Sequence, residues 1–295
     1  MSEFQYYEFL AVDRPLTGPE MRALRAITSR AEITPTSLVN TYQWGDFKGN
    51  PTTLMRKYFD AFLYYANWGT HTLMLRLPRR LLDGKTASRY CAAESAAARV
   101  AGSHVILEFH SEDESGDWEG EPEGWLASII PVRGELAAGD RRALYLAWLL
   151  CAQTGELRDT AREPPVPDGL GTLSSALSAF ADFLRIDREL IAVAAERSAA
   201  PPTAPTRRKL RQWLQRLPPD ERDTVLSRLV TGEDPGLRTE LWREIARGEE
   251  PDDKRRASAR ESGPRTVATL LRAAAEQKQR RPGMRNTVRA ADADE

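Results

Sequence analysis

The spacing of apolar residues changes once along this chain of 295 residues, and that change constrains the fold more than any other feature. Before residue 160, runs rich in aromatic and β-branched residues alternate with helical stretches; these runs occupy 4–12, 36–44, 71–77 and 103–110. After the proline-rich segment 162–169, apolar residues recur at intervals of three and four, which is typical of helices. The sequence therefore predicts an α/β or α+β sheet domain over 1–160, followed by an all-helical region.

The helical half divides into three predicted parts. Residues 168–199 form one long or two short helices, and residues 206–248 form a small three-helix unit. Each helix of that unit carries an apolar stripe, which we expect to be buried. Residues 249–295 form a basic tail that we expect to be disordered, apart from a short amphipathic helix at 266–277.

Local signals also predict individual helices in the first half. Thr17 and Glu20 have the spacing of a capping box, so we expect a helix over about 17–31. The alanine-rich segment 87–101 predicts a second helix, and 135–155 predicts one largely buried helix. We expect Trp68 and Gly69 to end a helix as a C-cap with a packed indole.

Residues 43–51, QWGDFKGNP, raise a more specific question, because their composition suits both a tight turn and a ligand-binding loop. Asn50 is a good N-cap, with Pro51 at the first helical position. Helical spacing then continues through Leu54, Tyr58, Phe62 and Tyr65. We expect Gly45 and Gly49 to supply positive φ in this connection.

Three residues of this loop have no role in the turn or the cap: Trp44, Phe47 and Lys48. In a sheet with alternating helices, the loop would lie at the edge where open sheets usually build sites. These three residues are therefore candidate partner-binding residues, alongside the purely architectural interpretation of the loop.

The cysteines and the apolar runs of the sequence predict a cytoplasmic protein. Basic and acidic residues are nearly balanced, at 42 and 43. Cys91 and Cys151 are far apart and form no metal-binding or redox motif, so we expect buried thiols in a reducing compartment. The longest apolar run, 143–152, is too short to span a bilayer, and the start of the chain lacks a signal-peptide pattern.

No catalytic or cofactor motif occurs along the chain. There is no phosphate-binding loop, nucleophile elbow or His-Glu-x-x-His pattern, and the acidic run at 112–123 does not fit a calcium loop. The three histidines fall at or inside predicted strands, where core or edge roles are expected: His71, His104 and His110. We predict no catalytic residues, cofactor or metal, and the question of an enzyme stays open.

The tail carries most of the local charge. Residues 254–289 contain eleven basic and two acidic residues, a net charge of +9. The predicted helix would place Val267, Leu270, Leu271 and Ala274 on one stripe for docking on a partner. Its arginines and lysine would face phosphates, and the candidate binding residues are Arg255, Arg256, Arg272, Lys278, Arg280 and Arg281.

Two resemblances bear on function. The segment YYEFLAVDRPLTGPEMRALRAITSRAEITPTS, the motif WGDFKGNP and the segment LPPDERDTVLSRLVTGEDPGLRTELWREI resemble an uncharacterised family of bacterial proteins without assigned activity. Residues 217–246 are also similar to a stretch in bacterial SWIM zinc-finger proteins, which accompany helicase-like ATPases. This chain lacks the Cys and His ligands of such a finger, so the resemblance implies a shared module or a shared functional neighbourhood and not metal binding.

These observations favour a non-enzymatic cytoplasmic interaction or accessory protein associated with nucleic-acid machinery. The expected partners are a protein, of the helicase-associated kind, and nucleic acid bound weakly and non-specifically through the tail. No membrane partner is expected. The alternative is a metal-dependent hydrolase or nuclease with a dispersed carboxylate site at the sheet edge.

Overall fold

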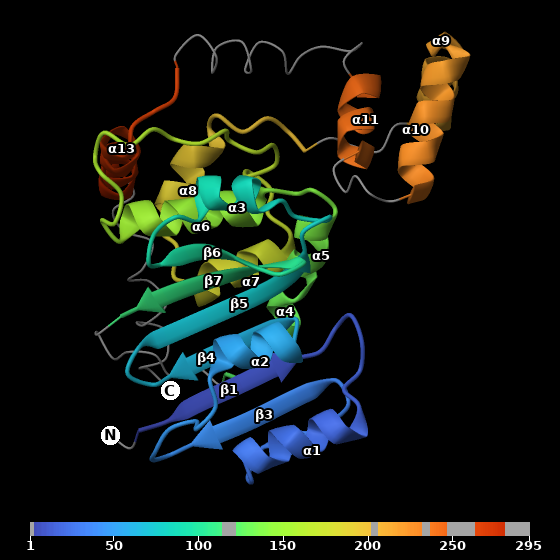
Figure 1. Cartoon of the computed structure of the whole chain (residues 1–295). Coiled ribbons are helices and arrows are strands. Elements are labelled where there is room, and N and C mark those ends of the chain that lie inside the picture. Colours follow the sequence, from blue (N-terminus) through green and yellow to red (C-terminus); the bar gives the residue numbers. More distant parts are fainter. Residues whose placement is uncertain (1–2, 114–121, 202–205, 232–236, 247–262, 281–295) are drawn as a thin grey trace, which may run out of the picture.

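The computed structural model describes residues 3–113, 122–201, 206–231, 237–246 and 263–280. Within them, seven strands form one sheet in the order β2-β3-β1-β4-β5-β7-β6 (Figure 1). The strands are β1 (Gln5–Leu10), β2 (Glu32–Ile33), β3 (Ser37–Tyr42), β4 (Ala61–Ala66), β5 (Thr70–Pro78), β6 (Ala96–Ala101) and β7 (His104–Glu112).

Every neighbouring pair of strands in this sheet is antiparallel. The α+β prediction is therefore confirmed, and the alternative of an α/β fold with parallel crossovers is wrong. Two of these pairs are joined by tight turns that permit only antiparallel pairing. β4 and β5 join at Trp68 and Gly69, and β6 and β7 join at Gly102 and Ser103.

Strand β4 occupies a segment that the sequence assigned to a helix. Helix α2 (Pro51–Lys57) ends at Lys57, so Phe62 and Tyr65 lie in β4 and not on a longer helix. β4 is central and covered on both faces, so nearly all of its residues are buried. A strand buried on both faces lacks the apolar–polar alternation that distinguishes strands from helices.

The same error affects two other predicted elements. The segment 87–101 is helix α3 (Gly84–Tyr90) followed by edge strand β6, although alanine favours helices. Trp68 and Gly69 form the β4–β5 turn rather than a helix C-cap, and Gly69 has φ +99°. A Cβ at Gly69 would lie 1.7 Å from the Asp113 carbonyl oxygen, so only glycine fits this close approach.

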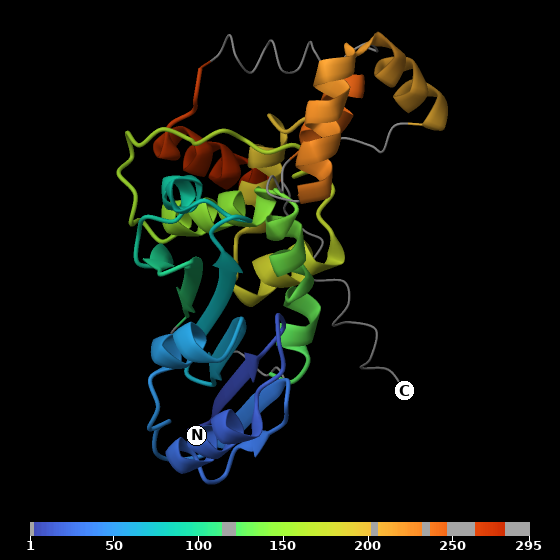
Figure 2. The same ribbon diagram turned by 45° about the vertical axis from the view of Figure 1, so that its right-hand side comes forward.

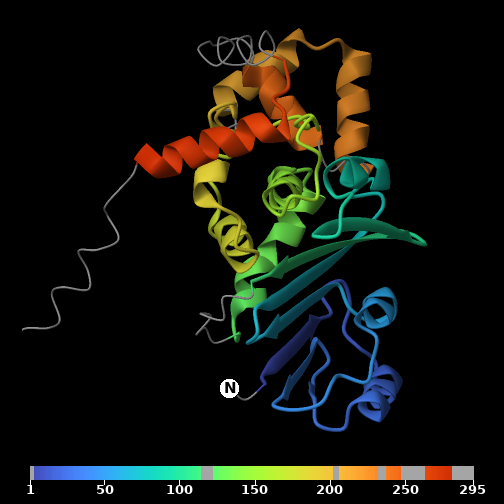
Figure 3. The same ribbon diagram turned by 90° about the vertical axis from the view of Figure 1, so that its left-hand side faces the viewer.

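Helices cover the two faces of the sheet unequally (Figure 3). On one face, α1 (Gly18–Ile27) and α2 lie over the β3–β1–β4 part, in a cluster containing Phe9, Leu24 and Phe62. A larger cluster fills the other face. Its helices are α3, α4 (Trp125–Ile129), α5 (Pro131–Ala137), α6 (Arg142–Gln153), α7 (Ser175–Phe183), α8 (Arg188–Ala195) and α13 (Val267–Arg280).

Several local predictions agree with these helices. Thr17 and Glu20 form both hydrogen bonds of a capping box at α1, and the Asn50 side chain accepts from the Thr53 N–H at α2. The segment 168–199 contains two short helices, α7 and α8. The single helix predicted over 135–155 is instead split into α5 and α6, where Gly139 has φ +84°.

Helix α13 belongs to the body of the molecule. Val267 and Leu270 are buried in the larger cluster, and the helix packs on α8 and α6. The predicted stripe therefore docks on the chain itself and not on a partner. The predicted disorder of the tail falls mainly on 247–262 and 281–295, which lie outside the described residues.

Three further helices of the described residues form an appendage, defined as α9 (Arg207–Arg216), α10 (Pro219–Thr231) and α11 (Leu237–Ala246), which projects from the body (Figures 1 and 2). The chain leaves and re-enters the body at one place, because Arg197 Nη1 donates to the Gly263 carbonyl oxygen at 2.6 Å. The appendage is thus an insertion between α8 and α13.

The apolar stripe of α10 is largely exposed, and that of α9 is half-buried. Leu226 is 60% exposed and Val230 78%, and α9 and α10 contain no buried residue. The expectation that these stripes form a core is therefore wrong for both helices. In α11, Leu237 is buried. No helix in the described part of the chain has the length and apolar content needed to cross a membrane.

Candidate functional site

One buried side chain, Gln5, fixes the 43–51 loop to the sheet. Its Nε2 donates to the Gly45 carbonyl oxygen at 3.0 Å and to Asp46 Oδ1 at 3.2 Å. Its Oε1 accepts from the Tyr7 hydroxyl at 2.7 Å and from the Tyr64 hydroxyl at 3.2 Å. Because the nitrogen faces two acceptors and the oxygen two donors, the surroundings determine the orientation of the amide.

The three candidate residues of this loop have different environments. Phe47 is buried, with its ring centroid 5.2 Å from that of Tyr7 and 5.9 Å from that of Phe9. The prediction that Phe47 contacts a partner is therefore wrong, because its ring completes the core. Trp44 is 75% exposed and Lys48 is exposed, and their role in binding stays a prediction.

The two glycines also differ from each other. Gly45 has φ +81°, as predicted. Gly49 does not have positive φ, so that prediction is wrong. A Cβ at Gly49 would instead lie 2.7 Å from the Phe47 ring and 3.1 Å from Ile27 Cγ2, so glycine is needed there for space.

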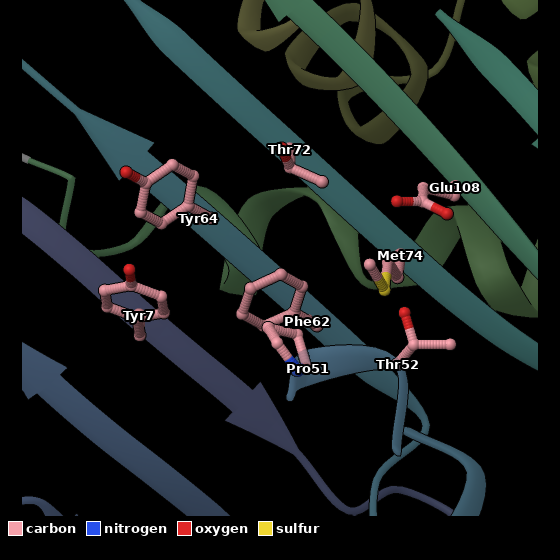
Figure 4. A pocket seen from close by; sticks show the side chains of 8 residues that line it. All are labelled: Tyr7, Pro51, Thr52, Phe62, Tyr64, Thr72, Met74 and Glu108. Atoms are coloured by element: carbon pink, nitrogen blue, oxygen red, sulfur yellow. The ribbon is translucent and has the colours of Figure 1, made fainter. Parts of the chain in front are cut away.

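A groove of about 300 Å³ lies beside this loop, on the face of the sheet that α1 and α2 only partly cover (Figure 4). We call it the sheet groove. Its lining residues come from α2 and from four adjacent strands: Tyr7, Pro51, Thr52, Phe62, Tyr64, Thr72, Met74 and Glu108.

Strand register brings the lining residues together in two rows across the sheet. In the first row, Tyr7 lies opposite Tyr64, Tyr64 opposite Thr72, and Thr72 opposite His110. In the second row, Phe62 lies opposite Met74, and Met74 opposite Glu108. Pairing between distant segments creates this site, and no local motif in the sequence marked it.

Hydrogen bonds continue along the first row beyond the groove. Thr72 Oγ1 lies 3.1 Å from His110 Nδ1, and His110 Nε2 lies 3.0 Å from Glu112 Oε1. Since an ionised carboxylate only accepts, Nε2 carries the proton of a neutral His110 ring, and Nδ1 accepts the proton of the Thr72 hydroxyl. In the imidazolium form both ring nitrogens donate, so His110 Nδ1 would then donate to Thr72 Oγ1.

Glu108 is the only residue lining the groove whose side chain is acidic or basic. Its Oε2 lies 3.0 Å from Arg99 Nη1, and Arg99 does not line the groove. Burial raises the pKa of Tyr7 to about 12 and also raises the pKa of Tyr64, so both hydroxyls stay neutral near pH 7.

Carboxylates at one end of the sheet are paired with arginines. Asp60 is buried and accepts from Arg76 Nη2 at 2.7 Å and from the backbone N–H groups of Val12 and Asp13. Asp13 in turn accepts from Arg133 Nη2 at 2.6 Å. Across the described residues, no group of three or more His, Cys, Asp or Glu side chains is placed to hold a metal ion.

A second buried network holds helix α13 against the helices beneath it. The Glu163 carboxylate accepts from Arg265 Nε at 2.9 Å and Nη2 at 2.7 Å, and also from the Tyr145 hydroxyl. Arg265 Nη1 donates to the Val193 carbonyl oxygen at 2.8 Å. All of these groups are structural, because they lie inside the helical layer and close it around α13.

The candidate residues of the tail are only partly within the described chain. Arg272, Lys278 and Arg280 are exposed on α13, where Lys278 Nζ lies 3.6 Å from Asp187 Oδ2. Arg255, Arg256 and Arg281 lie outside the described residues. The described part of the tail therefore presents a small basic surface on the body.

A stronger basic surface lies on α9, where five of ten residues are basic and none is acidic. Arg207, Arg208 and Arg211 are exposed and lie within about a third of the helix circumference, next to the apolar stripe. We call them the arginine face. Its sequence signal is the run RRKLRQWLQR, in which basic residues are interleaved with the apolar stripe.

Comparison of the chain with family models, with curated proteins and with solved structures finds no match in any of the three.

Proposed function

We propose that this chain is a cytoplasmic accessory protein that binds the backbone of nucleic acid non-specifically through the arginine face of α9. The observation that carries the proposal is the charge of this helix: five basic residues, no acid, and an exposed position on an appendage. Guanidinium groups bind phosphate through paired hydrogen bonds, so such a face suits a chain of phosphates.

Two further features support this proposal. The N-terminus of α9 is capped by Thr206, and the helix dipole adds positive potential beside Arg207 and Arg208. Residues 217–246, which lie mostly in α10 and α11, resemble a stretch of SWIM zinc-finger proteins, and these accompany helicase-like ATPases. Because the appendage carries no base-reading motif, we expect binding to depend on charge and to tolerate any sequence.

The test is a salt titration by fluorescence anisotropy, with labelled single- and double-stranded DNA and RNA. The variant Arg207→Ser/Arg208→Ser/Arg211→Ser removes the arginine face. Its matched control, Arg22→Ser/Arg79→Ser/Arg80→Ser, removes three exposed arginines from the body. Both variants change the net charge equally, so a difference between them reports the location of binding.

We expect the wild type and the control to bind, with affinity falling steeply as salt rises. The arginine-face variant should bind at least tenfold more weakly, and its salt slope on double-stranded DNA should fall by about 2 to 3, one unit for each lost phosphate contact. Equal loss of affinity in both variants, or absence of binding by the wild type, would contradict the proposal. Circular dichroism checks that α9 stays helical.

A further inference from the structure

We infer that the sheet groove binds an alkylammonium group, through the Glu108 carboxylate and the Thr72 hydroxyl oxygen, with the carbon chain of the ligand on the side chains of Phe62 and Met74. This site is separate from the arginine face and has the opposite preference for charge. The inference rests on which hydrogen-bonding groups the groove has left to offer.

The hydroxyl protons of the two tyrosines in the groove are already in use. Tyr7 and Tyr64 both donate to Gln5 Oε1, whose orientation is determined by its own two donations to the loop. The Thr72 hydroxyl donates to His110 Nδ1 when that ring is neutral. Neither tyrosine therefore has a proton left to donate, whereas the Thr72 oxygen keeps a lone pair that can accept whether His110 Nδ1 accepts from it or donates to it.

The negative charge of the groove also favours a ligand that donates hydrogen bonds. Glu108 adds a carboxylate, which also only accepts, and its Oε1 is not the atom that meets Arg99. A ligand that fits must therefore supply several donors and favour a negative partner. An ammonium group has three donors, no acceptor and a positive charge.

The apolar part of the groove suits the carbon chain of such a ligand. Phe62 and Met74 lie in the row that ends at Glu108, and Tyr7 and Tyr64 have ring centroids 4.8 Å apart. Aromatic rings attract cations through their π faces, and thioethers pack against alkyl groups. An alkyl chain over Phe62 and Met74 would direct its ammonium group to Glu108.

The charge on the ligand can be tested with three small probes of equal length: n-butylammonium, butan-1-ol and butyrate. Binding to the full chain is followed by chemical-shift changes in protein NMR spectra. We expect n-butylammonium to bind, with at least tenfold higher affinity than butan-1-ol, and butyrate not to bind. Equal affinity for all three probes, or preference for butyrate, would overturn the inference.

Four variants locate the site. Glu108→Gln should weaken n-butylammonium binding at least tenfold, and Thr72→Val, which keeps the shape of the side chain but removes one acceptor, should weaken it severalfold. Arg99→Gln removes the competing cation and should strengthen binding severalfold. Glu32→Gln, an exposed carboxylate on edge strand β2, should leave binding unchanged.

The inference predicts opposite changes in affinity: weaker binding of n-butylammonium in Glu108→Gln and stronger binding in Arg99→Gln. A variant that merely disturbed the sheet would weaken binding in both cases, and that result would overturn the inference. Thermal unfolding of each variant checks the fold. The arginine-face variant should bind n-butylammonium normally, so failure of either proposal is separable from failure of the other.

A last comparison distinguishes two sources of the ammonium group, a free polyamine and a protein lysine. The probes are spermidine and N-acetyl-lysine methylamide. Tighter binding of spermidine than of n-butylammonium would identify a small polyamine as the ligand, and tighter binding of the lysine derivative would identify a lysine side chain. If neither binds, alkylammonium recognition at this groove is contradicted.

Discussion

At the scale of single residues, Gly45 and Gly49 serve different purposes in the same loop. Gly45 has positive φ with open space around it, whereas Gly49 has ordinary φ with the Phe47 ring against it. Gly45→Ala should therefore lower the free energy of unfolding by about 1 kcal/mol, the cost of left-handed backbone in an L-residue. Gly49→Ala should lower it by about 1–3 kcal/mol through overpacking.

Urea unfolding monitored by tryptophan fluorescence measures both values. The position of Phe47 separates the two mechanisms, because only Gly49→Ala should displace its ring. In the background Phe47→Leu, the cost of Gly49→Ala should shrink while the cost of Gly45→Ala stays the same. Equal costs of Gly49→Ala in both backgrounds would contradict the steric explanation.

His71 predicts a pH dependence of stability. Its ring is fully buried, stacks on Phe183, and lies with Nδ1 2.7 Å from the Phe183 carbonyl oxygen. Burial lowers the pKa of His71 from 6.5 to about 4; the hydrogen bond to Phe183 opposes this shift, and the nearby charge of Arg185 adds to it. Between those two values the unfolded state binds more protons than the folded state.

The contribution of His71 is therefore fully present above about pH 6.5 and is lost as pH falls toward 4, by about 3 kcal/mol in total. Urea unfolding at a series of pH values should show this decline in the wild type. His71→Asn should largely remove the decline, whereas His104→Gln should retain most of it. An unchanged pH dependence in His71→Asn would show that other groups cause it.

At the scale of elements, α13 depends on one buried ion pair. Arg265→Met would leave the Glu163 carboxylate inside the helical layer without its counter-ion, and such losses cost about 3–5 kcal/mol. Glu163→Gln/Arg265→Met removes both charges and keeps an acceptor for Tyr145, so it should recover much of that loss. Chemical unfolding of the single and double variants measures the difference.

A double variant no more stable than Arg265→Met would contradict this account of the ion pair. The same structure explains why α13 cannot be removed as a tail. A chain ending before residue 263 would lose Arg265, Val267 and Leu270 from the interior, so its binding defects would reflect a damaged fold. Binding by the basic residues is better tested by substituting exposed side chains.

At the scale of the whole molecule, the appendage is an insertion whose two ends lie close together, where Arg197 contacts Gly263. Replacing 202–262 by about six glycine and serine residues should therefore leave the body folded. We expect the thermal midpoint to change by less than about 5 °C, because the sheet, both clusters and α13 remain. Nucleic-acid binding should be lost, and n-butylammonium binding should persist.

Calorimetry and the two binding assays check this prediction together. A loss of cooperative unfolding would show that the appendage is part of the core, and Leu237, which is buried, marks the place where such a contact would lie. Nucleic-acid binding by the shortened chain would move the proposed site from α9 to the exposed arginines of the body.

The sequence by itself determined features whose causes are local. The Thr17 capping box, the Asn50 cap and the turn at Gly45 depend on residues within a few positions, and each is observed. The division into a sheet half and a helical half follows from the change in apolar spacing. The burial of Cys91 and Cys151 also agrees with their small apolar character.

Only the tertiary structure decided which faces are covered, because burial depends on segments that are distant in the chain. β4 is a strand since β1 and β5 pair with it, and α13 is core since α8 packs on its stripe. The stripes of α9 and α10 have the same period, but neither contains a buried residue. The sheet groove is likewise assembled from four strands and α2, so periodicity shows that a side chain can be buried, and the partner segments determine whether it is.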